Sequence, residues 1–159
     1  MYLSIHAAAG VLIGTYTAQP FIAFVLGLFS HFILDAIPHY DGNIELKGHT
    51  LKTLNATQSN KLINLLIIEI ILGVSAILML YHQHPLLTPT IFWAVSGSIL
   101  PDIFQFLLLL SPGNTFLRWF DDLHQGIHYQ SKNPVAPIVG LTIQLITFIA
   151  ILIPIIYTI

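Results

Sequence analysis

The sequence predicts an all-α fold, a polytopic membrane helical bundle of about five transmembrane helices forming a single domain over residues 1–159. Three observations support this prediction. Hydrophobic residues make up 55% of the chain and charged residues 8%, whereas soluble domains carry about 25% charged residues. The apolar residues gather into long segments separated by polar stretches. Within these segments they run continuously and do not alternate as in the strands of a membrane barrel.

The apolar segments have about the length that a spanning helix needs, roughly 20 residues. They are Tyr2–Ala18, Pro20–Ile37, Leu62–Tyr81, Leu87–Leu110 and Pro134–Tyr157. The first two are slightly short, so a tilted or partly interfacial pair is an alternative for them. The first lacks a basic leading region and a cleavage pattern, which favours a retained helix over a signal peptide. The longer polar connections are Pro38–Lys61 and Ser111–Asn133, and both contain turn-forming residues.

The basic residues predict the orientation of this bundle. They are Lys47, Lys52, Lys61, Arg118 and Lys132. In a five-span arrangement all of them share one side of the membrane with the N-terminus, and the positive-inside rule makes that side cytoplasmic. We therefore expect a multi-pass protein of the inner (cytoplasmic) membrane, with its C-terminus outside and membrane lipids as partners. A net charge of −2 argues against nucleic-acid binding.

Several ionisable residues lie inside the apolar segments, where they are costly and usually functional. They are His6, His31, Asp35, Glu69 and Asp102. At 1.5 Å per residue, His31, Glu69 and Asp102 each lie about 12 Å inside the predicted cytoplasmic face. His6 enters from the same face about one helical turn in. The sequence thus predicts a polar layer near the cytoplasmic side, supplied by four segments.

The spacing of the histidines in and near this layer is typical of metal ligands. His31 and Asp35 stand at i and i+4 on one helix face, and His39 continues that stripe. A second i, i+4 pair, His124 and His128, lies in the last polar connection. Nitrogen and carboxylate ligands suit zinc, manganese or iron better than calcium or magnesium. We expect a divalent metal, zinc first, with Asp35 able to bridge two ions; the absence of cysteine excludes thiolate ligands.

Each signal also has an ordinary structural interpretation. His31 and Asp35 could be a buried hydrogen-bonded pair that ties helices together. Asp102 could belong to a kink at Pro101, and Glu69 is expected to pair with His31 or a neighbouring helix more readily than with a metal. The pair in the last connection could be solvated. Three further histidines, His49, His82 and His84, are interpreted as surface residues. The occurrence of so many groups at one depth favours the metal site.

Four sequence blocks resemble one protein family. They are Ile5–Gly10, Gly27–Asp35, Ser98–Asp102 and His124–His128. Together they resemble blocks of the bacterial inner-membrane family of metal-dependent hydrolases, which is similar to zinc-dependent phospholipase C. The Gly27–Asp35 block comes first in this chain, whereas it follows the other two in the family. Gln125 stands where that family has an arginine.

The resemblance implies metal ligands and a reaction. The ligands it implies are His6, His31, Asp35, Asp102, His124 and His128. The reaction is metal-dependent hydrolysis of a phosphoester, with a lipid or lipid-linked phosphate as substrate. We expect Asp41 or Glu69 to serve as the catalytic base. The alternatives are a non-catalytic membrane subunit that uses the layer for helix packing or docking, a cation or proton pathway, and a haem carrier.

Overall fold

The computed structural model describes residues 1–41, 53–81, 88–128 and 135–158, and these residues form helices and no strand. The helices are α1 (Leu3–Tyr16), α2 (Pro20–Asp35), α3 (Ala56–Tyr81), α4 (Pro89–Leu110), α5 (Thr115–Ile127) and α6 (Pro137–Thr158). The all-α prediction is confirmed, since every helix except α5 falls on an expected apolar segment. The predicted surface or orienting residues Lys47, Lys52, Lys132, His49, His82 and His84 lie outside the described residues.

Helix α5 corrects the expectation of an irregular connection between the last two apolar segments. The turn after α4 ends at Asn114, whose side chain caps α5 by accepting a hydrogen bond of 3.1 Å from the Leu117 amide. Helix α5 has only 13 residues and is amphipathic, with polar and apolar side chains on different sides. A search for long, uninterrupted apolar runs cannot detect such a helix.

Other helix starts also follow from local sequence. Thr88 caps α4 by accepting a hydrogen bond of 3.3 Å from the Ile91 amide, and proline follows at the first helical position. Before α3, the side chains of Asn55 and Gln58 each accept a hydrogen bond from the other's amide, at 2.8 and 3.0 Å. This reciprocal arrangement satisfies two amides that have no partner within the helix.

Small residues allow α1 to lie directly on α4. Gly10 and Gly14 are one turn apart on α1 and face Val95 and Ile91 on α4. A Cβ added at Gly10 would lie 2.6 Å from the Cα of Val95, and one at Gly14 would overlap the Cα of Ile91. Glycines four residues apart bring helix backbones close together in membranes, where packing replaces the hydrophobic effect.

Helix α2 approaches α4 in the same way, from both sides of the contact. A Cβ at Gly27 of α2 would overlap the carbonyl of Ala94, and one at Gly97 of α4 would overlap the carbonyl of Phe24. Ala94 is fully buried in this contact. The tight α1, α2 and α4 packing positions the polar side chains described below.

The outer surface of α2 is apolar, and four of the five residues buried on its inner face are small or polar. The buried residues are Ala23, Gly27, His31, Leu34 and Asp35. The exposed ones include Phe21 (76%), Phe29 (61%) and Ile33 (67%). A water-soluble bundle has the opposite pattern. Within the described residues, α4 and residues Pro137–Tyr157 of α6 are long and apolar enough to cross a membrane, whereas α1 and α2 are shorter apolar helices.

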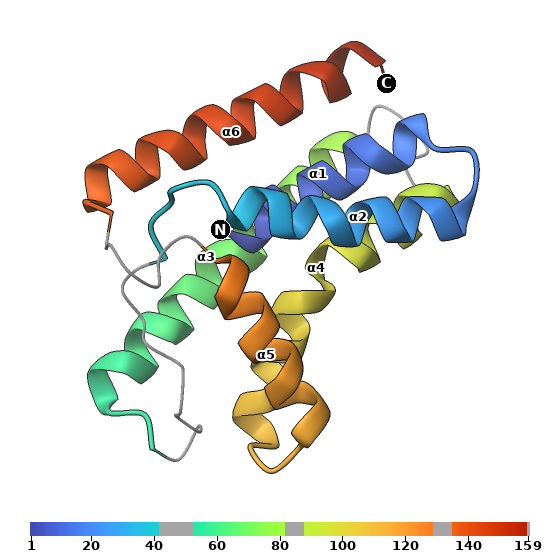
Figure 1. Cartoon of the computed structure of the whole chain (residues 1–159). Helices are drawn as coiled ribbons and strands as arrows, with labels where there is room; N and C mark the ends of the chain where they lie inside the picture. Colours follow the sequence, from blue (N-terminus) through green and yellow to red (C-terminus); the bar gives the residue numbers. More distant parts are fainter. Residues whose placement is uncertain (42–52, 82–87, 129–134, 159) are drawn as a thin grey trace.

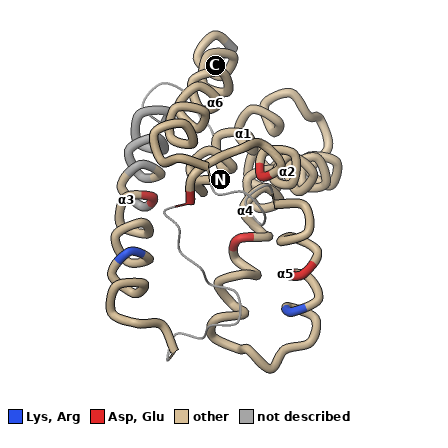
Figure 2. The backbone as a smooth tube through the Cα atoms, turned by 60° about the vertical axis from the view of Figure 1, so that its left-hand side comes forward, with Lys and Arg blue, Asp and Glu red and all other residues tan. Residues whose placement is uncertain are grey.

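The helices are arranged in two parts. Helices α1 and α2 run side by side with the first half of α4, and α6 contacts α1 and lies above it in Figure 1. The second half of α4 turns away and pairs with α5 (Figure 1). Pro101 lies inside α4, where proline removes one backbone hydrogen bond and kinks the helix. The basic residues of α3 and α5 lie in the lower half of Figure 2, away from α1, α2 and α6.

Candidate metal centre

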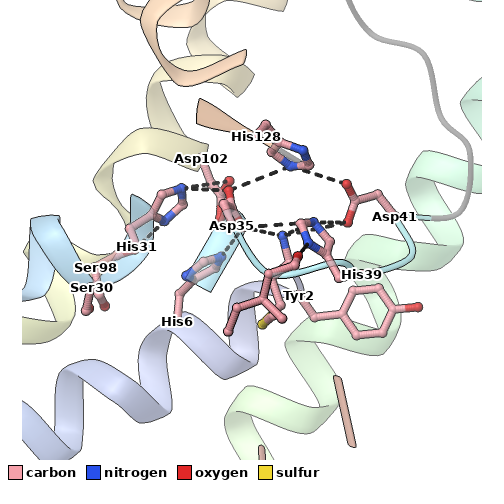
Figure 3. Close-up of polar contacts among 12 residues, drawn as sticks. Tyr2, His6, Ser30, His31, Asp35, His39, Asp41, Ser98, Asp102 and His128 are labelled. Carbon is pink, nitrogen blue, oxygen red and sulfur yellow. Dashed lines mark hydrogen bonds and ion pairs between the residues drawn. The ribbon is translucent and has the colours of Figure 1, made fainter. Parts of the chain in front are cut away.

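Asp35 is the centre of a buried cluster of histidines and carboxylates (Figure 3). It is the last residue of α2 and is 1% exposed. Its Oδ1 lies 2.5 Å from the α-amino nitrogen of Met1 and 3.1 Å from His6 Nε2. Its Oδ2 lies 2.8 Å from His124 Nε2 and 3.2 Å from His31 Nε2. A carboxylate buried this deeply requires positive charge or several hydrogen-bond donors around it.

The first ligand group consists of His31, Asp35, Asp102 and His124, whose ligand atoms all lie within 4.8 Å of one another. His31 Nε2 is 3.1 Å from His124 Nε2 and 3.9 Å from Asp102 Oδ1. Tetrahedral ligands about 2.0–2.2 Å from a zinc ion lie roughly 3.3–3.6 Å from one another. The spacing of this group therefore fits a single ion.

The hydrogen bond made by His31 Nδ1 determines whether Nε2, which faces the cluster, carries a proton or a lone pair in the neutral ring. His31 Nδ1 donates to the Ser98 carbonyl at 2.7 Å, because a carbonyl can only accept. A neutral His31 then presents a lone pair at Nε2, and this lone pair faces Asp35 Oδ2. Two lone pairs at that distance repel each other. Either the ring carries a second proton or a cation lies between the two atoms.

The second ligand group consists of Asp35, His39 and His128, whose ligand atoms also lie within 4.8 Å of one another. His39 Nε2 is 4.0 Å from Asp35 Oδ1, and His128 Nε2 is 3.7 Å from Asp35 Oδ2. His39 Nδ1 donates to the Ile37 carbonyl at 2.7 Å. The Nε2 lone pair of a neutral His39 faces the cationic Met1 α-amino group, which can donate a hydrogen bond to it.

Asp41 lies beside the second ligand group, as expected for a catalytic base. Its Oδ1 is 2.9 Å from His39 Nε2 and its Oδ2 is 3.3 Å from His128 Nε2. Burial alone would raise the pKa of Asp41, but the hydrogen bond with His39 and the charge of the Met1 α-amino group hold it below its usual value. Asp41 is 30% exposed and is therefore a carboxylate within reach of solvent.

Two further observations show which charges the cluster favours. Burial lowers the pKa of His128 to about 4 despite the nearby carboxylates Asp35 and Asp41, so the ring is neutral at pH 7 and can bind a metal. Burial would lower the pKa of the Met1 α-amino group as well, but the carboxylates Asp35, Asp41 and Asp102 together outweigh burial and raise it. The α-amino nitrogen also lies 2.7 Å from His39 Nε2. The cluster therefore stabilises a cationic group at its centre.

The structure brings all seven predicted ligands to this cluster, and Asp41 with them. His39 belongs to the second ligand group although it follows the end of α2. His124 and His128 extend from the C-terminal end of α5 rather than from a loop, because His128 is the C-cap residue. His6 lies against the cluster, with its ring stacked on His31 at a centroid distance of 4.0 Å. Its Nδ1 has no hydrogen-bond partner among the described residues.

Glu69 has a different position from the other predicted residues. It is 6% exposed on α3, and its Oε2 accepts a hydrogen bond of 2.7 Å from the Ser4 amide in the first turn of α1. A carboxylate at this end of a helix satisfies an unpaired amide and complements the helix dipole. Its pairing with a neighbouring helix is thus confirmed. A role for Glu69 as catalytic base remains a prediction.

Helix α6 supports the second ligand group through two residues that the sequence reading did not select. The amide side chain of Gln144, 2% exposed, accepts from the Tyr2 amide at 3.2 Å and donates to the Tyr40 carbonyl at 2.8 Å. One turn earlier, a Cβ added at Gly140 would lie 2.6 Å from Tyr40 Cβ. The sequence feature that could have indicated this role is Gln144, a single amide side chain in an otherwise apolar segment.

Comparison of the chain with protein-family models, with curated proteins and with solved structures finds no match. The site is therefore described by its own geometry. Its buried histidines and aspartates can hold a metal ion.

Proposed function

We propose that this protein is a membrane-embedded, metal-dependent hydrolase of a phosphoester, with zinc as the first candidate metal. The observation that carries the proposal is the pair of rings, His31 and His39, whose Nδ1–H groups donate to backbone carbonyls. Their Nε2 atoms then face carboxylate oxygens of Asp35 and Asp41 at 3.2 and 2.9 Å. At His31 a divalent cation would relieve this repulsion, whereas at His39 the Met1 α-amino group already lies 2.7 Å from Nε2, and a metal there would take the place of that ammonium. Fixing the ring through its other nitrogen is usual for metal-bound histidine.

The sharing of Asp35 by both ligand groups supports a site for two ions. In two-metal sites the ions lie about 3.5–4 Å apart and stabilise the attacking and leaving oxygens of a phosphoryl group. Bound ions would supply Lewis acidity that polarises water and the phosphoryl oxygen. Asp41, held as a carboxylate beside the second ligand group, is placed to accept the proton of the attacking water. Water adds to phosphorus, the ester bond breaks, and the leaving alkoxide takes a proton.

The proposal places this site near the cytoplasmic face of the inner membrane. Helices α1, α2, α3, α4 and α6 are the proposed spans. The exposed apolar side chains of α2 support a lipid-covered bundle. The basic residues of α3 and α5, which lie toward the same part of the molecule, support a cytoplasmic location for that part. A phosphoester in a lipid head group reaches such a site without leaving the membrane. The resemblance of the Gly27–Asp35 block to metal-dependent hydrolases agrees with this proposal.

The second candidate is a non-catalytic membrane subunit whose cluster ties the helices together. Direct hydrogen bonds favour it, because His124 and His6 contact Asp35 at 2.8 and 3.1 Å without a metal. In that case the cluster is a network of hydrogen bonds and ion pairs around Asp35 that joins α1, α2, α4 and α5.

Metal analysis combined with a hydrolysis assay distinguishes the two candidates. The purified protein, Asp35→Asn and a control, Asp122→Asn on the exposed side of α5, are compared. Each sample is tested on phospholipid vesicles and on a soluble phosphodiester. We expect stoichiometric metal and hydrolysis in the natural protein and the control, and loss of both in Asp35→Asn. A natural protein that contains no metal and still has full thermal stability would support the non-catalytic membrane subunit instead.

A further inference from the structure

Helix α5 has three distinct faces. The first is buried against the bundle and carries Leu117, Asp121 and His124. The second is apolar and exposed, with Phe116 (54%), Trp119 (60%), Leu123 (45%) and Ile127 (41%). The third is polar and exposed, and includes Arg118 and Asp122. At about 100° per residue, the exposed apolar residues form one stripe along the helix. The exposed polar residues lie on a different side of the helix from this stripe.

The apolar stripe of α5 continues onto α4. The ring of Phe116 lies 5.8 Å from that of Phe104, between centroids, and Phe120 lies 5.0 Å from Phe104. Phe120 also contacts Phe32 of α2, at 6.3 Å. The second half of α4, which pairs with α5 in Figure 1, exposes further apolar side chains. They are Ile103, Phe106, Leu107 and Leu110. The apolar stripe of α5 is therefore continuous with the exposed apolar surface of α4, which is long and apolar enough to cross a membrane.

The length and charge of α5 determine how a bilayer can cover this stripe. A helix of 13 residues is about 20 Å long, whereas the hydrocarbon core is about 30 Å thick. Helix α5 also carries Arg118 and two aspartates, which the hydrocarbon core excludes. Full immersion in lipid would bury the polar face, and full exposure to water would leave the apolar stripe uncovered. Only the boundary between lipid and water satisfies both faces.

We propose that α5 lies in the membrane–water boundary, with the stripe Phe116, Trp119, Leu123 and Ile127 bound to the lipid bilayer. The inference rests on the membrane part of the proposed function and not on the metal. It places the buried face of α5, with His124, level with the lipid head groups. The bilayer surface thereby supports the helix that supplies ligands to both groups.

The two tryptophans of the chain test this inference directly. Trp119 lies on the α5 stripe, and Trp93 lies on α4, 46% exposed. Trp93→Phe leaves Trp119 as the only tryptophan, and Trp119→Phe leaves Trp93. Each full-length variant is reconstituted into phosphatidylcholine vesicles that contain lipids brominated at different depths along the acyl chain. Quenching by aqueous iodide is measured in the same samples.

We expect Trp119 to be quenched by the shallowest bromolipid and to be several-fold less accessible to iodide than free tryptophan. Quenching of Trp93 but not of Trp119 by bromolipids, with Trp119 open to iodide, would overturn the inference and leave α5 in water. A Trp119 shielded from both quenchers would also overturn it, since protein would then cover the stripe. If neither tryptophan responds to bromolipids, the membrane part of the proposed function fails.

Discussion

The two ligand groups share Asp35 but are built differently. In the first, every ligand is part of a helix, and α2 and α4 are held together by close glycine contacts. In the second, His39 and His128 both follow the end of a helix. His39 is held by the Ile37 carbonyl, and its neighbour Tyr40 is held by α6. The difference indicates that the first ligand group is the more rigid, and we expect it to hold a metal ion more tightly than the second.

Removal of one ligand from each group should give the largest effect. His31→Ala should weaken the tighter site by at least about 100-fold, because the loss of an outer-shell partner alone costs about 10–100-fold. His39→Ala should remove only the weaker site. Titration of the metal-free protein with Co²⁺, followed by its visible spectrum, measures both steps. Equal effects of the two substitutions on both steps would show that the groups are not separate sites.

The glycine contacts that hold the first ligand group should be sensitive to a single methyl group. Gly97→Ala places a Cβ against the Phe24 carbonyl, which is backbone and cannot rotate away. Overpacking of this kind costs about 1–3 kcal/mol. Thermal unfolding in detergent should show the loss. Gly113→Ala is the matched control, because no atom lies within 4 Å of its added Cβ. Equal melting temperatures for the two variants would argue against close α2–α4 packing.

Substitutions in α6 should weaken metal binding by the second ligand group alone. Gln144→Leu removes both hydrogen bonds to the Tyr2 and Tyr40 backbone, and Gly140→Ala pushes Tyr40 away by a different route. Both should weaken the weaker Co²⁺ site by about 10–100-fold, as outer-shell changes do. Gln144→Glu keeps the acceptor for Tyr2 and should have an intermediate effect. A change confined to the tighter site would contradict this assignment.

The smallest expected effect is a loss of stability in acid that originates in the second ligand group. The pKa of His128 is about 4 in the folded protein and about 6.5 in an unfolded chain. Between these values the unfolded state binds the extra proton, so stability decreases as pH falls from about 6.5 to about 4. Thermal unfolding of the metal-free protein at pH 7.5 and pH 5 measures this. His128→Gln should reduce the difference between the two pH values, and an unchanged difference would contradict the assignment.

The sequence predicted which histidines and aspartates gather in the cluster better than it predicted the elements that carry them. His31 and Asp35 were predictable because a helix places residues four apart on one face. His124 and His128 were selected by the same spacing, but their helix was missed because α5 is short and amphipathic. The five-span topology remains a prediction, since two helices within the described residues meet the length and hydropathy requirement for a span.

Long-range contacts could not be predicted, because they depend on how the helices pack. The Ser98 carbonyl accepts from His31 across 67 positions, and no sequence pattern marks a backbone acceptor. Gln144 reaches Tyr2 across 142 positions. Glu69 was predicted at the same membrane depth as the candidate ligands, but a predicted depth does not distinguish a residue that accepts from the Ser4 amide of α1 from a metal ligand.

Anomalous X-ray diffraction from crystals of the zinc-loaded protein tests the central claim most directly. We expect two zinc peaks about 3.5–4 Å apart, one on each side of the Asp35 carboxylate. His31 and His124 should bind one ion through Nε2, and His39 and His128 the other. Absence of zinc at Asp35, with both rings of His31 and His39 hydrogen bonded directly to carboxylates, would contradict it.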